Sequence, residues 1–245
     1  MPRTAMRVMT VTTMIVTAMM SIAIVTAMIC NVDFIVMRTR YNHISIDKAT
    51  INSLPIESFS GHIHIIDSIE EARRAVQLLR EHDILGIDTE TRPSFRKGHT
   101  NKVSLIQLST RTDCYLFRIN KIGLIEELRA LLTDKDLLKV GISLRDDFSV
   151  LHRVDSFEPQ NFIDLQSVVG KYGIDDMSLQ KIYAIIFGKK ISKSQRLTNW
   201  EAEQLSVPQQ YYAALDAWAC LHIYDALQEG VDFYHTQSKQ EDIII

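Results

Sequence analysis

Two carboxylates lie two residues apart at the end of an apolar run in ILGIDTETRP, residues 84 to 93. Ile84, Leu85 and Ile87 are typical of a buried strand, and Asp88 and Glu90 come at its end. Because side chains alternate across a strand, residues two apart point to the same side. The two carboxylates therefore share one face, where their charges repel each other and burial makes ionisation still more costly.

Two further segments carry acidic residues in similar surroundings. VGISLRDDFSVL, residues 140 to 151, has Asp146 and Asp147 where a predicted strand meets a helix. YYAALDAWACLHIY, residues 211 to 224, has Asp216 within an otherwise apolar helix, where a carboxylate is costly unless it is paired or binds metal. Tyr212 lies four residues before Asp216, so the two side chains occupy one face of that helix.

A cluster of these carboxylates would require cations. Oxygen-only ligands suit hard ions such as Mg²⁺ or Mn²⁺ better than zinc. Two such ions roughly 3.5–4 Å apart support in-line displacement at phosphorus, because one activates water and the other stabilises the leaving oxygen. Bound metal would thus offset the repulsion between Asp88 and Glu90. The acidic segments predict two divalent metal ions, Mg²⁺ or Mn²⁺, and no small-molecule cofactor.

The hydrophobic pattern predicts one α/β domain over about residues 60–230 that holds these segments. Ser68 and Ser206 are each followed three residues later by Glu or Gln, which is typical of a helix start. Strands are expected at 62–66, 84–88, 102–108, 114–118 and 137–141, and helices after Ser68 and at about 123–132, 145–153, 164–172, 178–187 and 206–228. This order predicts a mixed sheet flanked by helices.

Taken in order, the motifs resemble the DEDD superfamily of 3′-5′ exonucleases, in its tyrosine-type branch. The D-x-E motif is matched by Asp88 and Glu90, and the Y-x-x-x-D motif by Tyr212 and Asp216. KVSLIQLST, CYLF, KVGI, NWE and YYAALDAW make the chain most similar, within that branch, to the exonuclease domain of the Werner syndrome helicase. The resemblance runs from about residue 62 to 228 and implies a ribonuclease H-like fold.

The resemblance also implies a role for each matching residue. Its second motif, an Asp that opens a helix, is better matched by Asp147 than by Asp146, because Phe148 and Leu151 supply the apolar places that follow. Asp146 fits an exposed residue at a helix N-terminus. Tyr212 would orient the attacking water, since a phenol with an ordinary pKa near 10 is a weak base. The expected catalytic set is Asp88, Glu90, Asp147, Tyr212 and Asp216, with the four carboxylates as metal ligands.

Contacts to the 3′ end of a nucleic acid are expected from Thr89 and from the basic residues Lys102, Lys193 and Arg196. The alternative for such basic residues is a solvated surface. A net charge of −3 does not indicate a polyanion partner, although local patches matter more than the sum. The preferred function is release of nucleoside monophosphates from 3′ ends, with DNA favoured by the Werner-like motifs. The alternatives are ribonuclease D-like processing of RNA 3′ ends and a catalytically silent nucleic-acid-binding module.

The first 36 residues form an extension of different composition. Eight of the nine methionines lie in the first 37 residues, and no charged residue occurs from Val8 to Val32. Three alternatives are open: the natural start is Met37, residues 8–32 are a membrane or export segment, or the extension holds a helix of the folded core. The first alternative predicts a cytoplasmic protein, as does the absence of a CxxC pair among the three cysteines, and the second predicts a membrane-anchored one. Residues 37–59 are expected to be a lead to the domain, and residues 231–245 a C-terminal tail.

Overall fold

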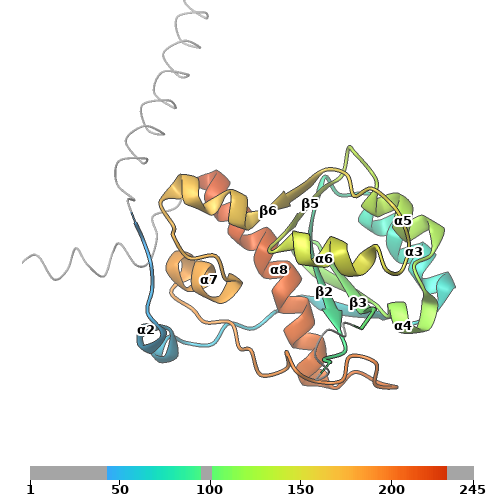
Figure 1. Ribbon diagram of the computed structural model, residues 1–245, viewed down its shortest axis with the longest axis horizontal. Helices are drawn as coiled ribbons and strands as arrows, with labels where there is room; N and C mark the ends of the chain where they lie inside the picture. Colours follow the sequence, from blue (N-terminus) through green and yellow to red (C-terminus); the bar gives the residue numbers. More distant parts are fainter. Residues whose placement is uncertain (1–42, 95–100, 231–245) are drawn as a thin grey trace, which may run out of the picture. The chain divides into compact units, whose positions relative to one another are not determined.

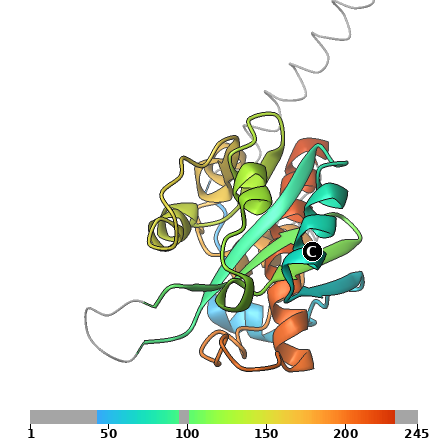
Figure 2. The ribbon, with the colours of Figure 1, turned by 90° about the vertical axis from the view of Figure 1, so that its right-hand side faces the viewer.

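A mixed β-sheet forms the centre of the protein in the computed structural model, which describes residues 43–94 and 101–230. Within those residues the sheet has six strands in the order β1-β4-β3-β2-β5-β6. β3 is antiparallel to both of its neighbours, and the other strand pairs are parallel. The strands are β1 (His62–Ile66), β2 (Ile84–Thr91), β3 (Val103–Ser109), β4 (Asp113–Phe117), β5 (Leu138–Gly141) and β6 (Phe162–Asp164). Figure 2 shows the long strands β2 and β3 side by side.

Helices cover both faces of this sheet, so the α/β fold class expected from the sequence is confirmed. The apolar side chains of Leu85 and Ile87 pack in a core with α3 and α5. The long helix α8 lies along the sheet and contacts five of its strands (Figure 1). The helices are α2 (Lys48–Ser53), α3 (Ile69–Leu79), α4 (Ile119–Ile122), α5 (Glu126–Leu132), α6 (Leu144–Leu151), α7 (Leu179–Phe187) and α8 (Val207–Glu229).

Helix α8 packs unusually close to β2. It begins with the predicted capping box, in which Ser206 and Gln209 satisfy each other's backbone N–H groups, and it ends at Gly230 in the left-handed conformation. A Cβ atom on Gly86 would lie only 2.1 Å from the carbonyl oxygen of Ala217. The small residues of YYAALDAWAC and the glycine of ILGID together allow this approach. As a result, Asp216 lies beside the strand that carries Asp88.

The structure differs from the sequence-based expectation in four elements. The helix expected at about 123–132 is α5, which begins at Glu126, and the short helix α4 before it was not expected; α4 ends at Gly123, whose φ of 68° is accessible to glycine. The helix expected at 164–172 is a pair of 3₁₀ turns, Leu165–Ser167 and Val169–Tyr172. Helix α2 and strand β6 were not expected. With six and three residues, both are too short to show a hydrophobic period.

Residues 43–59, expected as a lead to the domain, pack against it. Isolated backbone bridges join Ile44 to Ile174 and Ile56 to Lys190. Glu57 accepts hydrogen bonds from the hydroxyl of Tyr183 and from Nζ of Lys189. Five apolar side chains of this segment are buried, namely Ile44, Ile46, Ile51, Leu54 and Phe59. The segment therefore belongs to the same compact unit as the sheet.

Among residues 43–94 and 101–230, no helix is long and apolar enough to cross a membrane. The possible membrane segment at 8–32, the rest of the N-terminal extension and the tail at 231–245 lie outside the described residues.

Candidate active site

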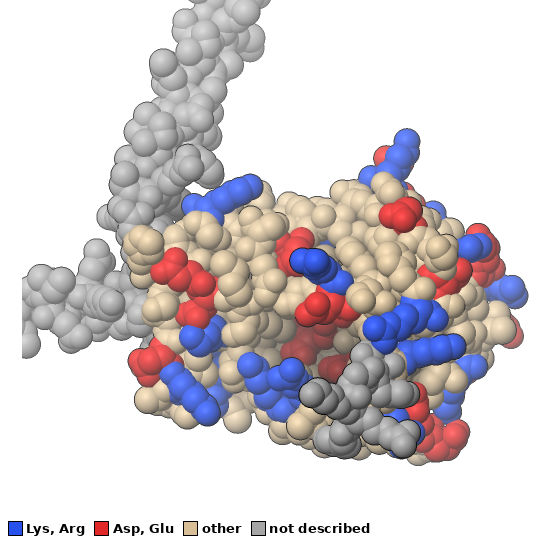
Figure 3. Space-filling view, viewed as in Figure 1, with Lys and Arg blue, Asp and Glu red and all other residues tan. Residues whose placement is uncertain are grey.

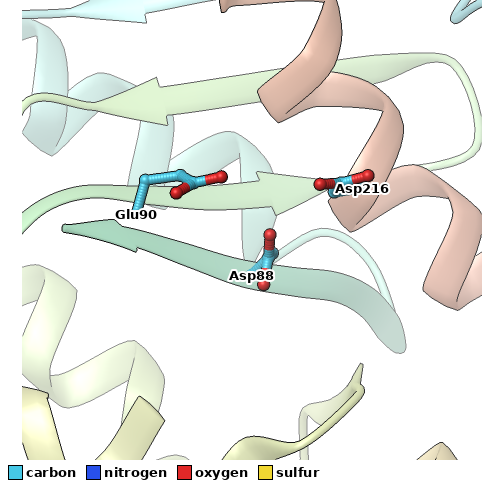
Figure 4. A group of neighbouring side chains, drawn as sticks. All are labelled: Asp88, Glu90 and Asp216. Carbon is cyan, nitrogen blue, oxygen red and sulfur yellow. The ribbon is translucent and has the colours of Figure 1, made fainter. Parts of the chain in front are cut away.

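Three carboxylates meet between β2 and α8. Asp88 and Glu90 extend from β2, and Asp216 extends from the middle of α8 (Figure 4). Each residue offers a carboxylate oxygen, and these oxygens all lie within 4.8 Å of one another. Asp216 is buried and the other two are half-buried. Strand β2 and helix α8 are far apart in the sequence, and their packing in the fold brings the three carboxylates together as a compact group of oxygen ligands.

Asp147 approaches the same space from α6. Its carboxylate accepts a hydrogen bond from the hydroxyl of Thr89, the residue between Asp88 and Glu90. Asp146, its neighbour on the helix, is exposed. Asp147 is therefore the one of the two that contacts β2, although it lies outside the group of three oxygens described above.

The start of α6 is fixed by a residue that sequence reasoning did not single out. The carboxylate of Asp164, at the end of β6, accepts hydrogen bonds from the backbone N–H groups of Ser143 (3.1 Å) and Leu144 (2.9 Å). Ser143 has a φ of 58°, so the chain turns sharply from β5 into the helix. This turn directs the first turn of α6, with Asp147, toward β2. A three-residue strand gives no periodic signal that could have marked Asp164.

A cavity of about 330 Å³ joins the four carboxylates and Tyr212. Thr89, Lys193 and Arg196, three of the residues predicted to contact the substrate, also line it. Lys102 is exposed and is not among the lining residues, so its position does not support a substrate contact. Figure 3 shows acidic side chains recessed in a hollow, with lysine and arginine side chains near its rim. The described residues lining it are Asp88, Thr89, Glu90, Ile142, Ser143, Asp146, Asp147, Ser178, Leu179, Gln180, Ile191, Lys193, Arg196, Tyr212 and Asp216.

Burial and mutual repulsion raise the pKa values of Asp88 and Glu90. Burial makes the largest contribution for both side chains, followed by the charges of Asp216 and Asp147. The pKa of Glu90 reaches about 9 even though the guanidinium of Arg196 lowers it, and that of Asp88 rises well above its ordinary value. Without cations, Glu90 therefore retains its proton at neutral pH.

Asp147 and Asp216 each have a pKa of about 7, again mainly because of burial. The hydroxyl of Thr89 opposes the increase at Asp147, and the hydroxyl of Tyr212 and the ammonium of Lys193 oppose it at Asp216. A cluster of oxygen ligands that resist ionisation until a positive charge arrives suits hard divalent cations.

Tyr212 is held in place by its packing. Its ring lies 6.0 Å from the ring of Trp200, which is fully buried and therefore packs in the core rather than on a base. The side-chain amide of Gln209 donates hydrogen bonds to Thr198 Oγ1 (3.0 Å) and to the carbonyl of Asn199 (3.2 Å), which anchors the loop before Trp200. Burial and the neighbouring carboxylates raise the pKa of Tyr212. Its hydroxyl therefore keeps its proton at neutral pH.

A sheet with one antiparallel strand, flanked by helices and carrying acidic residues on β2, α6 and α8, is the architecture of ribonuclease H-like nucleases. Solved structures agree: the EXO domain of Aedes aegypti Nibbler matches with a TM-score of 0.63 and 24% identity over 77% of this chain and 91% of that one. Escherichia coli RNase D, described as an exoribonuclease involved in structured RNA processing, matches with a TM-score of 0.62 and 25% identity over 69% of this chain and 44% of that one.

Sequence comparison identifies the family. Residues 63–232 match the 3′-5′ exonuclease family, so the chain belongs to it. A 3′-5′ exonuclease of Arabidopsis thaliana is 30% identical over 79% of this chain and 73% of its own length. The bifunctional 3′-5′ exonuclease/ATP-dependent helicase WRN of Mus musculus is 32% identical over 61% of this chain, but over only 11% of that protein. The protein is therefore a 3′-5′ exonuclease of the DEDD superfamily, a hydrolase of phosphodiester bonds.

Proposed function

We propose that this protein is a metal-dependent exonuclease of the tyrosine-type branch, which releases nucleoside monophosphates from 3′-hydroxyl ends, with DNA as the favoured substrate. The observation that carries the proposal is the convergence of Asp88, Glu90 and Asp216 in a cavity that Asp147 and Tyr212 also line. Its volume of about 330 Å³ suits a single nucleotide, since small-molecule sites begin at about 300 Å³.

The four carboxylates, Asp88, Glu90, Asp147 and Asp216, would hold two divalent ions, Mg²⁺ or Mn²⁺. Their oxygens form a ligand set for hard ions, and their pKa values, which burial raises most, mean that their ionisation is costly without a nearby positive charge. When bound, such ions activate water and stabilise the leaving oxygen of an in-line displacement.

The remaining residues orient the reactants. Tyr212 keeps its proton at neutral pH, so its hydroxyl acts as a hydrogen-bonding group that positions the attacking water rather than as a base. Lys193 and Arg196 lie at the cavity, where they would hold substrate phosphates. The backbone at Thr89 lies between the two carboxylates of β2, beside which the terminal 3′ hydroxyl would bind. Bases must be unstacked to enter, so single-stranded ends should be preferred.

RNA is the second candidate substrate. Similarity to the WRN protein favours DNA, whereas a Ribonuclease D of Gluconacetobacter diazotrophicus is 27% identical over 69% of this chain. The sugars differ by a 2′ hydroxyl, and contacts to it would decide the preference. A silent nucleic-acid-binding module is disfavoured, because such a module would have no use for the full set of carboxylates and the tyrosine.

The test uses single-stranded DNA and RNA of equal sequence, each labelled at the 5′ end and incubated with Mn²⁺, Mg²⁺ or EDTA. We expect a ladder that shortens from the 3′ end, mononucleotide products, no cleavage in EDTA and slower cleavage of 3′-phosphate ends. The Asp88→Ala variant is the control for contaminating nucleases. Degradation of a closed circular strand as fast as a linear one would refute the proposal, and a preference for RNA would correct only the substrate.

A further inference from the structure

A buried amide beneath the candidate metal site has no hydrogen-bond partner. Gln107 lies in the middle of β3, and its side chain is fully buried. Neither its side-chain nitrogen nor its side-chain oxygen has a partner among the residues that the structure describes. Burial of an unpaired amide opposes folding, and native proteins retain few of them without a functional reason.

The position of Gln107 in the sheet connects it to Asp88. The two residues are directly opposite each other in the antiparallel β2–β3 pair, and Leu116 is the direct neighbour of Gln107 on β4. Opposite residues of such a pair point to the same face of the sheet, with Cβ atoms about 4.5–5.5 Å apart. That face is the one toward α8, because Gly86, two residues before Asp88, contacts Ala217 of α8. Asp88 is therefore the only charged side chain directly beside the amide on these two strands.

Because Gln107 is fully buried, it cannot have the substrate-contacting role proposed for the residues that line the cavity. It cannot contact a nucleic acid in the cavity, and it does not line that cavity. Carboxylates that bind metal are commonly held by a hydrogen bond from a group behind them. A neutral amide can supply that bond without cancelling the negative charge that attracts cations, which a lysine or arginine at the same place would do.

We infer that Gln107 is a positioning residue for Asp88, whose side-chain Nε2 donates a hydrogen bond to the Asp88 carboxylate when divalent ions are bound. This inference rests on the proposed metal site. It explains why a polar side chain occupies the apolar interior of β3, between Leu105 and Leu108 in the sequence. The inference predicts opposite effects of Gln107 on two properties: it would strengthen metal binding and lower the stability of the metal-free fold. An amide with a purely structural role would instead stabilise the metal-free fold.

The test replaces Gln107 with methionine, which has a similar length and no hydrogen-bonding amide. Mn²⁺ binding is measured by electron paramagnetic resonance without nucleic acid, and the melting temperature is measured in EDTA. We expect the dissociation constant for Mn²⁺ to rise about 10- to 100-fold, with an unchanged or higher melting temperature. Leu108→Met is the matched control, because the adjacent residue faces the opposite core, and it should bind Mn²⁺ as the wild type does.

The outcomes distinguish the inference from the proposed function. Wild-type Mn²⁺ affinity in Gln107→Met, or a lower melting temperature in EDTA with unchanged affinity, would overturn the role of Gln107 alone. If the wild type binds no Mn²⁺, or if Asp88→Ala binds as tightly as the wild type, the proposed metal site itself fails. Should Gln107→Met not fold, Gln107→Asn keeps an amide that is one methylene too short, and the same loss of affinity is expected of it.

Discussion

The carboxylates of the candidate site conflict with the stability of the fold around them. Asp216 is buried in α8 near Asp88 and Glu90, and its charge raises the pKa values of both, which burial raises most. The sequence made this conflict visible, since a charge among apolar residues and a D-x-E pair at a strand end are both unfavourable without a partner. Such residues are retained for function rather than for folding, and their replacement should separate the two properties.

Asp216→Asn should abolish nuclease activity and raise the melting temperature of the metal-free protein at pH 8, because it removes one of the repelling charges. Activity is measured with a 5′-labelled strand and the melting temperature in EDTA. Asp225→Asn is the control on the same helix, since Asp225 pairs with Arg111 outside the cluster. Normal turnover by the Asp216 variant would contradict the assignment of this carboxylate.

Tyr212→Phe keeps the ring against Trp200 and removes only the hydroxyl. We expect the single-turnover rate to fall roughly 10²- to 10⁴-fold, the range typical of groups that position or transfer a proton, with little change in Mn²⁺ affinity. Tyr211→Phe removes a hydroxyl from the neighbouring residue, which is 45% exposed, and should leave the rate unchanged. Equal rates for the two variants would mean that Tyr212 only packs.

At the scale of elements, the sequence predicted the helices and strands that have long apolar patterns, and it did not predict the short elements. The β2 and α8 assignments followed from ILGID and YYAALDAW, so Asp88, Glu90 and Asp216 could be placed near one another. The contact of Asp147 with Thr89 depends on the turn at Ser143 and on Asp164 of the three-residue strand β6, and neither leaves a periodic pattern. Lys102 was grouped with the site because it flanks the D-x-E strand in the sequence, but it is exposed and does not line the cavity.

The segment 43–59 should contribute to stability, although no helix or strand was predicted in it. Ile46 is 2% exposed, so Ile46→Ala should lower the free energy of unfolding by about 2–5 kcal/mol. Ile56 in the same segment is 66% exposed, so Ile56→Ala should change the free energy of unfolding by at most about 0.5 kcal/mol. Urea titration of both variants checks this expectation, which fails if the two substitutions have equal effects.

For the molecule as a whole, the acidic cluster links stability to pH in an unusual direction. A carboxyl whose pKa is higher in the folded state than in the unfolded state makes the folded protein bind more protons. Stability is then complete below the unfolded value of about 4 and decreases as pH rises through the folded value. With Asp147 and Asp216 at about 7 and Glu90 at about 9, the loss extends from about pH 4 to pH 9.

The melting temperature of the metal-free protein should therefore fall between pH 5 and pH 8.5, and Mn²⁺ should reduce the loss. His222 acts in the opposite direction below about pH 6.5, because burial lowers its pKa. The comparison to make is therefore between the wild type and Asp216→Asn. The melting temperature of the variant should fall less steeply with rising pH. Parallel melting curves for the two proteins across this pH range would show that the cluster does not carry the effect.

The close contact between Gly86 and the carbonyl oxygen of Ala217 also has a consequence for ionic radius. Asp216 precedes Ala217 on α8 and Asp88 follows Gly86 by two residues on β2, so this contact limits how far apart the two carboxylates can lie. Mg²⁺ binds oxygen at 2.0–2.1 Å and Ca²⁺ at 2.3–2.6 Å. A side chain at position 86 would wedge the helix outward and widen the gap. We therefore expect the missing side chain at Gly86 to favour Mg²⁺ over the larger Ca²⁺ at the proposed metal site.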